Sequence, residues 1–233
     1  MGTSVAVYFS SSSESGTTAR LLSAFMKGLE RGGDETRIYD VREIQPLPCT
    51  GEFHCWHKDP GNCYIQDGMQ DLYPALRQAD TLVLGTPVYI PLPGEMQNLL
   101  NRLCPIVDPE LETRDGRTRG KIREGVKIRQ VALVASSGWW EIENMDTVVR
   151  IAREFAEDAS IPLVGAVLRP HAAMALSPQG KPSEILQASE QAGVELASTG
   201  KIRAETLSTV SQPLIGQEEY RQYLNRMRAS PSE

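Results

Sequence analysis

Val5-Ala6-Val7-Tyr8-Phe9 runs directly into Ser10-Ser11-Ser12-Ser13-Glu14-Ser15-Gly16-Thr17-Thr18. The first five residues are apolar and rich in β-branched and aromatic side chains, which predicts a short buried strand. After the hydroxyl-rich stretch, apolar residues recur every three or four positions up to Leu29, as on one face of a helix. Gly32-Gly33 then ends the expected helix. A strand that passes through a polar loop into a helix is typical of an α/β fold.

The same alternation continues along the chain. We expect four further strands and five further helices, the strands at 36–39, 81–85, 130–135 and 163–168, and the helices near 71–78, 95–103, 145–159, 183–199 and 217–228. Strands that alternate with helices form a parallel sheet covered on both faces. The sequence therefore predicts one doubly wound domain over residues 1–233, with a five-stranded parallel sheet and a C-terminal helical extension at about 183–228. Residues 108–127, dense in charge and glycine, are expected to form an exposed loop or hairpin.

The overall charge excludes some classes of partner. Lys and Arg total 24 and Asp and Glu total 30, which gives a net charge of −6. Nucleic acids and anionic membranes favour clustered basic charge, so we expect neither as a partner. No apolar run approaches the ~20 residues that span a bilayer. The N-terminus lacks the basic segment of a signal peptide, and we expect a cytoplasmic protein.

The loop after the first strand offers hydroxyl groups and backbone N–H groups at the start of a helix. It contains neither GxGxxG nor GxxxxGK[ST], which disfavours a Rossmann-type dinucleotide site and a P-loop. Neutral donors and the helix dipole suit a phosphate monoester. A serine-rich helix cap without a ligand is the alternative. The hydroxyl-bearing residues are Ser10, Ser12, Ser13, Ser15, Thr17 and Thr18.

Two more strand-end loops carry aromatic side chains. Thr86–Gly94 is stiffened by three prolines and presents Tyr89, while Ser136–Trp140 ends in paired tryptophans. The first could border a planar ligand or simply pack Tyr89 in the core. The tryptophans could cover a ligand or line a subunit interface. In a parallel sheet such loops meet at one edge, where ligands bind. A ligand with one terminal phosphate and a flat tricyclic ring suits all three loops, and FMN is such a ligand.

These motifs, in this order, resemble the flavodoxin-like superfamily, and within it the NAD(P)H-dependent FMN reductase and iron–sulfur flavoprotein branch. The loop Ser10–Thr18 matches the family's serine loop, with Thr17 where the family has Asn. Thr86-Pro87-Val88-Tyr89 followed by Gly94 matches its second signature. Cys63–Met69 resembles the family's cysteine loop with its acidic end, and Arg102 is retained on the following helix.

The resemblance implies a bound FMN, a reduced nicotinamide as co-substrate and a homodimer or homotetramer. It implies that the first loop binds the phosphate and the other two the ring, through Ser10, Ser12, Ser15, Gly16, Thr17, Thr18, Thr86, Pro87, Val88, Tyr89, Ser137, Gly138, Trp139 and Trp140. The chemistry would be the flavin's, with the protein setting its orientation and potential. No residue pattern identifies a catalytic acid or base.

Three of the four cysteines, Cys49, Cys55 and Cys63, lie within fifteen residues. In a cytoplasmic chain such a cluster favours metal binding or redox chemistry over structural disulfides. Members of the branch hold a [4Fe–4S] cluster with four compact cysteines, but Glu52 stands at the second position here. The alternatives are a cluster completed by another ligand, zinc, a reactive thiol pair, or no metal. Cys104 follows a helix and is expected to pack in the core.

The function expected is an FMN-dependent oxidoreductase that passes electrons from NAD(P)H to a flavin, a quinone or a similar small-molecule acceptor. A non-enzymatic electron carrier with FMN, and possibly a cluster, is the alternative. A hydrolase is disfavoured because no Ser/His/Asp set stands out among His54, His57 and His171. His171 follows the last expected strand and is read either as a ligand-edge residue or as an ordinary loop residue.

Overall fold

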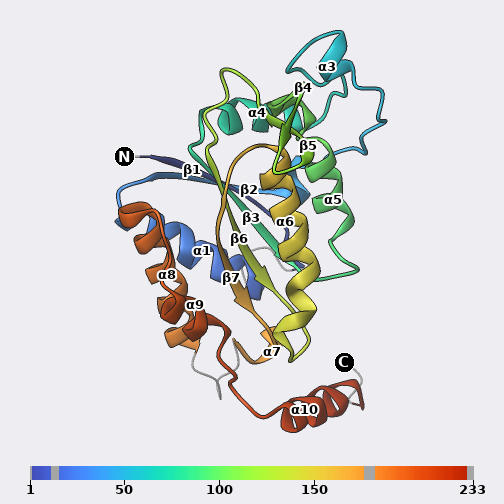
Figure 1. Cartoon of the computed structure of the whole chain (residues 1–233). Coiled ribbons are helices and arrows are strands. Elements are labelled where there is room, and N and C mark those ends of the chain that lie inside the picture. Colours follow the sequence, from blue (N-terminus) through green and yellow to red (C-terminus); the bar gives the residue numbers. More distant parts are fainter. Residues whose placement is uncertain (1, 12–15, 176–181, 230–233) are drawn as a thin grey trace.

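The expected sheet is present. The computed structural model describes residues 2–11, 16–175 and 182–229. Its central sheet has five parallel strands in the order β2-β1-β3-β6-β7 (Figure 1), namely β1 (Thr3–Tyr8), β2 (Glu35–Asp40), β3 (Thr81–Pro87), β6 (Gln130–Ser136) and β7 (Leu163–Arg169). The winding reverses between β1 and β3, which is where open α/β sheets bind ligands.

Helices cover both faces of the sheet (Figure 1). One face carries α1 (Thr17–Arg31), α8 (Pro182–Thr199) and α9 (Ala204–Ser211), and the other α4 (Met69–Gln78), α5 (Gly94–Asn101) and α6 (Asp146–Asp158). Alternation along β1 separates the two cores: Val5 and Val7 pack on the α4–α6 side and Ala6 on the α1 side. The last helix, α10 (Gln217–Ala229), lies beyond the end of the sheet.

Helices α1 and α8 touch backbone to backbone. A Cβ atom added at Gly28 would lie 1.9 Å from the carbonyl oxygen of Glu190, and one added at Gly193 would lie 2.1 Å from that of Phe25. Neither position has room for any side chain. The close approach fixes α1, and with it the loop at its N-terminus, against the C-terminal part of the chain.

The charged segment expected as a loop or hairpin is a hairpin, β4 (Val107–Arg114) and β5 (Arg117–Ile122). Asp115 and Gly116 form its turn with φ values of 52° and 72°, the conformation of a tight two-residue hairpin turn. Arg119 holds the hairpin to α6 through ion pairs with Glu154 and Asp158.

Helix α9 was not expected from the sequence. The backbone N–H of Arg203, which precedes α9, donates to the carboxylate of Glu195 on α8 at 2.9 Å. Thr206 donates to the same carboxylate. Burial alone would raise the pKa of Glu195, but these hydrogen bonds outweigh it and lower the pKa to about 2. The cap of α9 thus comes from another helix, so local patterns do not reveal where α9 begins.

Short elements were also missed: α2 (Val41–Ile44), α3 (His54–His57), α7 (Ala172–Ala175) and the 3₁₀ turns Cys104–Ile106 and Ile142–Met145. Each is a single turn, too short to show periodicity. None of the helices in the described ranges is long and apolar enough to cross a membrane.

Candidate functional site

The three predicted ligand loops meet at the carboxyl edge of the sheet. They follow β1, β3 and β6, which are neighbours in the sheet. The hydroxyl groups of Thr18 and Ser136 are hydrogen-bonded at 2.7 Å, and the N–H of Val88 donates to the carbonyl of Ser136 at 2.7 Å. Ser136 therefore joins all three loops.

The first loop ends at the N-terminus of α1. Gly16 precedes the helix, and the first N–H that bonds back to its carbonyl belongs to Arg20. The N–H groups of the first turn therefore face the end of the helix, where an anion binds. Ser10 is buried beside this end. Two predicted ligands of the phosphate, Ser12 and Ser15, lie outside the described residues.

The threonine hydroxyls at this helix end tie loops together. Thr17 donates to the carbonyl of Ala172 at 3.1 Å, and Thr18 pairs with Ser136. In this arrangement the hydroxyl groups of Thr17 and Thr18 are engaged by the protein, and their backbone N–H groups lie in the first turn of α1. This division of roles was not evident from the sequence.

The second loop presents an aromatic face. Tyr89 is 49% exposed, and its ring meets the ring of Phe9 edge to face at 6.1 Å. The guanidinium of Arg42 lies 5.9 Å from the centre of the Phe9 ring. Thr86 is buried and donates to the carbonyl of Pro87, so it shapes the loop, while Tyr89 is free to contact a ligand.

The third loop contains two tryptophans in different environments. Trp139 is 62% exposed. Trp140 is half-buried, stacks on His171 with ring centres 6.2 Å apart, and donates to the carbonyl of Ile215 at 3.1 Å. The hydroxyl of Tyr220, on α10, donates to the carbonyl of Gly138 at 2.7 Å. Helix α10 thus backs the loop, leaving a groove of about 310 Å³ beside Trp139 and Trp140.

A buried cation lies behind this loop. Arg169, at the end of β7, is fully buried, and its guanidinium donates to the carbonyls of Val210 and Gln212 and contacts His171. Among the described residues no carboxylate pairs with it. Burial lowers its pKa to about 10. Sequence reasoning missed Arg169 because nothing local reveals that it is buried.

His171 is buried beside Arg169. Its Nε2 accepts from the N–H of Leu214 at 3.1 Å, and its Nδ1 has no partner among the described residues. Burial, and secondly the charge of Arg169, lowers its pKa to about 4. His171 is therefore neutral at pH 7 and connects the last strand to the segment before α10.

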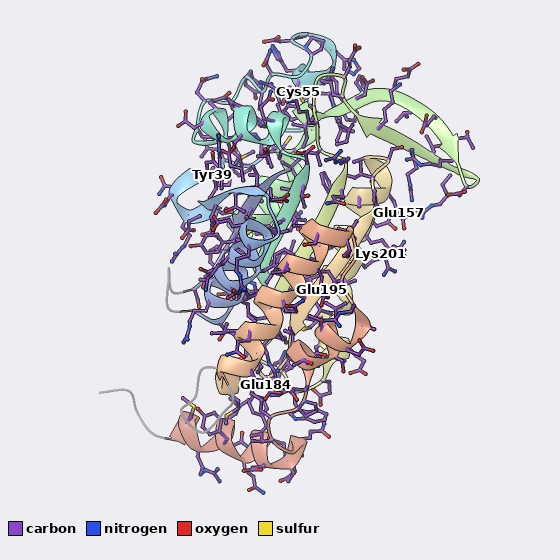
Figure 2. The ribbon with its side chains drawn as sticks, turned by 90° about the vertical axis from the view of Figure 1, so that its left-hand side faces the viewer. Tyr39, Cys55, Glu157, Glu184, Glu195 and Lys201 are labelled. Carbon is purple, nitrogen blue, oxygen red and sulfur yellow. The ribbon has the colours of Figure 1, made fainter. Side chains whose placement is uncertain are left out.

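The cysteines lie away from α10. Cys55, on α3, is far from α10 in both views (Figures 1 and 2). Cys49, Cys55, Cys63 and Cys104 line one small cavity of about 10 Å³, roughly the space for one water. Cys104 follows α5 and lies beside the other three, which its expected core role did not anticipate. Burial raises the pKa of Cys55 to about 11, and the other three thiols contribute.

A buried ion pair fastens the cysteine loop to the end of α5. Arg102 and Asp67 approach to 2.7 Å with both side chains buried. Arg102 also donates to the carbonyls of Leu47 and Ile65, on the two sides of the loop. Burial opposes the charge on Asp67, but the hydrogen bonds from Arg102 outweigh it and lower the pKa of that carboxyl. Within the described ranges, no three His, Cys, Asp or Glu side chains form a group that could hold a metal ion.

Comparison with known proteins agrees with this geometry. The sequence profile of the NADPH-dependent FMN reductase family matches residues 3–139. An iron–sulfur flavoprotein of Methanocaldococcus jannaschii is 27% identical over 92 residues, which cover 39% of this chain and 47% of that protein. The chain thus spans under half the length of this curated relative.

Two solved structures share the fold. An NAD(P)H:quinone oxidoreductase from Methanothermobacter marburgensis superposes with a TM-score of 0.58 at 15% identity, covering 84% of this chain and 98% of that one. An FMN-dependent NADH-azoreductase from Bacillus anthracis, solved with FMN, gives 0.56 at 14% identity over 85% and 98% of the two chains. At this identity the likeness confirms the flavodoxin-like fold.

The profile match covers more than half of the chain and includes the first two loops and the third as far as Trp139. It confirms, at the level of the family, the expected FMN and reduced nicotinamide. On this evidence the chain belongs to the NADPH-dependent FMN reductase family.

Proposed function

We propose that the protein is an FMN-dependent oxidoreductase that transfers electrons from NAD(P)H to a flavin, a quinone or a similar small-molecule acceptor. The observation that carries this proposal is the meeting of three loops, joined through Ser136, at the carboxyl edge of the sheet. Family membership supports it. The quinone oxidoreductase and azoreductase that share the fold support a flat acceptor.

The residues of the edge divide the binding of FMN among them. The first turn of α1 and Ser10 receive the phosphate, and the N–H groups of Thr17 and Thr18 contribute to its binding. Tyr89 and Trp139 border the isoalloxazine ring. The buried Arg169 favours negative charge at this edge, because its own charge has no carboxylate partner among the described residues. When bound, FMN supplies the hydride and electron chemistry.

The direct test is the colour and reduction of the purified protein. We expect protein reconstituted with FMN to remain yellow after gel filtration and to bleach anaerobically when NADPH or NADH is added. Steady-state oxidation of NAD(P)H should then require a quinone or free flavin. Protein that neither binds FMN nor bleaches would contradict the proposal. Bleaching without turnover would instead identify the electron carrier.

A pair of matched variants tests the ring site. Tyr89→Ala removes a half-exposed aromatic ring beside Phe9, and we expect FMN to bind about three- to tenfold more weakly, as measured by fluorescence quenching. Ile38→Ala is the control, because Ile38 is 46% exposed, like Tyr89, but lies on the edge strand β2. Equal affinity for FMN in both variants would show that Tyr89 does not contact the flavin.

A second cofactor is proposed at the cysteine loop. We propose that Cys49, Cys55 and Cys63 bind a [4Fe–4S] cluster, as the name of the iron–sulfur flavoprotein relative suggests. The thiol donor set suits such a cluster. Anaerobic purification, with assays of iron and acid-labile sulfide, tests this point separately from FMN binding.

The assembly and location of the protein stay as predicted from the sequence. We propose a homodimer or homotetramer in the cytoplasm. Light scattering of the FMN-loaded protein measures the oligomer, and a monomer at micromolar concentration would contradict it.

A further inference from the structure

All four cysteines of the chain line one cavity, although they come from two separate segments. Cys49, Cys55 and Cys63 lie in the cysteine loop, and Cys104 lies in the turn after α5. We infer that Cys104 is the fourth thiolate ligand of the [4Fe–4S] cluster, in the role that sequence order would give to Glu52. The inference rests on the cluster proposed above.

The backbone around Cys104 is tied to the loop. The indole N–H of Trp56 donates to the carbonyl of Cys104 at 2.9 Å. Trp56 adjoins Cys55 on the single turn α3, so this bond holds two of the thiol-bearing segments together. Arg123 adds a second tie, since its guanidinium donates to the carbonyls of Cys55 and Pro105 at 3.4 and 3.0 Å.

Cys63 is held in a similar way. The side-chain amide of Gln70, on α4, donates to the carbonyl of Cys63 at 3.2 Å. The ion pair between Arg102 and Asp67 fixes the same side of the loop. The backbones of Cys63, Cys104 and Cys55 therefore accept hydrogen bonds from α4, from α3 and from Arg123 after the hairpin, and Cys49 is the exposed member.

Glu52 is engaged in a different task. Its carboxylate accepts from the hydroxyl of Thr50 and from the N–H of His54 at 3.2 Å. Both partners lie within two residues of Glu52, so its carboxylate is engaged in local bonds at the start of α3, which begins at His54. Glu52 is an exposed residue, while Cys104 is half-buried. A carboxylate is also a poorer partner than a thiolate for the irons of such a cluster.

A separate observation indicates an anionic ligand. Arg102 lines the cavity, is 1% exposed, and its Nε has no hydrogen-bond partner among the described residues. A buried N–H without an acceptor is costly. A cluster with four thiolates carries a net negative charge, and hydrogen bonds to its sulfurs are common. The Nε–H of Arg102 is available for such a bond.

The donor set of four thiols suits a cubane cluster. No three candidate ligands in the described residues are grouped to hold one metal ion, and the ligands of a cubane stand farther apart than those of zinc. Ligation replaces four S–H bonds with four Fe–S bonds and releases four protons, with no change in oxidation state. The cavity measures about 10 Å³, and Cys49 is the exposed member of the four thiols.

Matched variants test the inference. Protein is purified anaerobically and reconstituted with iron and sulfide, as wild type, Cys104→Ser and Glu52→Gln. We expect about four irons and four sulfides per chain in wild type and in Glu52→Gln. We expect Cys104→Ser to lose at least half of both and the absorption shoulder beyond the flavin bands. A full cluster in Cys104→Ser, or its loss in Glu52→Gln, would overturn the inference.

Two further measurements distinguish loss of the cluster from unfolding of a variant. FMN affinity should be equal in all three proteins, because none of the residues proposed to bind FMN lines the cysteine cavity. A Mössbauer spectrum of the ⁵⁷Fe-loaded wild type should show thiolate ligation at every iron, and a distinct oxygen-ligated iron would also overturn the inference. Zinc without iron in the purified wild type would exclude the cluster while leaving the FMN function intact.

Discussion

Two arginines, Arg102 and Arg169, are equally buried, at 1% and 0% exposure, but their charges are balanced differently. Arg102 has a buried carboxylate partner, Asp67, and its pKa is raised because that pairing outweighs the effect of burial. Arg169 has carbonyl oxygens and a neutral histidine, and its pKa is lowered to about 10. The charge of Arg102 is thus balanced by a carboxylate, whereas that of Arg169 is balanced by none among the described residues.

The different pairing of the two arginines matches their positions, since Arg102 lies at the cysteine loop and Arg169 lies at the carboxyl edge of the sheet. Arg102 binds the cysteine loop firmly to α5 through its ion pair with Asp67, and its Nε–H, without a partner among the described residues, is the group inferred to meet the cluster. Arg169 leaves a positive field at the edge where the phosphate and flavin are proposed to bind. One arginine is therefore chiefly structural, while the other combines a structural role with an electrostatic one.

Breaking the pair at the cysteine end should have the largest effect. Arg102→Met leaves Asp67 buried without a counter-charge, and we expect the free energy of unfolding to fall by about 3–5 kcal/mol in urea titration. Arg129→Met is the control, because Arg129 is 70% exposed and pairs with Asp80 at the surface, where about 0–1 kcal/mol is expected. Similar losses of unfolding free energy in both variants would show that the ion pair of Arg102 with Asp67 stabilises the protein no more than a surface ion pair does.

His171 should make stability depend on pH at the flavin end. Its folded pKa of about 4 lies below the ordinary value of 6.5, so the unfolded chain takes up the proton first. Stability therefore falls as the pH drops from 6.5 to 4, by on the order of 3 kcal/mol. The neighbouring titratable groups are Arg169 and Tyr220, both of which keep their protons throughout that range.

His171→Gln, which retains an acceptor for the N–H of Leu214, should flatten this part of the profile. The contribution of Asp67 is a useful contrast, because its pKa is lowered from 3.8 and its stabilisation is lost only below that value. A variant profile that still falls between pH 6.5 and about 5 would assign the titration to another group, since Glu195, whose pKa is lowered from 4.5, contributes only below that range. Urea titrations at several pH values measure it.

Removing the unpaired cation should cost less than breaking the ion pair. Arg169→Met strands the carbonyls of Val210 and Gln212 but also removes a buried charge, so we expect a loss of about 1–3 kcal/mol. The same variant should weaken FMN binding, whereas Arg102→Met should not. A loss of unfolding free energy as large as that of Arg102→Met, with unchanged FMN affinity, would show that the two arginines have the same structural role.

The smallest effect is expected at α10. Tyr220→Phe removes the hydrogen bond to the carbonyl of Gly138, and we expect a loss of about 0.5–1.5 kcal/mol. Amide exchange of residues in α10 should quicken with it. Tyr223→Phe is the control, since the Tyr223 hydroxyl makes no hydrogen bond within the described residues. Equal exchange rates in the two variants would show that α10 is held by other contacts.

The sheet could be predicted from the sequence because its signals are local. Each central strand is a short apolar run followed by polar residues, as at Ser10 and Thr86, and the helices of both faces show regular spacing. Helix α9 escaped prediction because Glu195, on another helix, caps it. Hydrogen bonds from a distant residue such as Glu195 cannot be predicted from the residues next to the start of α9.

The candidate site was predictable to a similar degree. Its loops stood out because unusual residues follow strands, which placed Tyr89 and Trp139 at one edge. Two other features depend on contacts between distant segments: the burial of Arg169, and the position of Cys104 beside Cys55. For Cys104 one signal was available, since the cysteine loop lacks a fourth thiol and the chain has a single cysteine elsewhere.

The contact between Gly28 and Gly193 has an evolutionary consequence. The two glycines face one another's helices without space for a methyl group, so a substitution at either position pushes α1 and α8 apart. The N-terminal half, with the phosphate loop, and the C-terminal half therefore cannot be exchanged independently between homologues. A chimera that inherits alanine at either position would misplace α1, the helix at whose N-terminus the phosphate is proposed to bind.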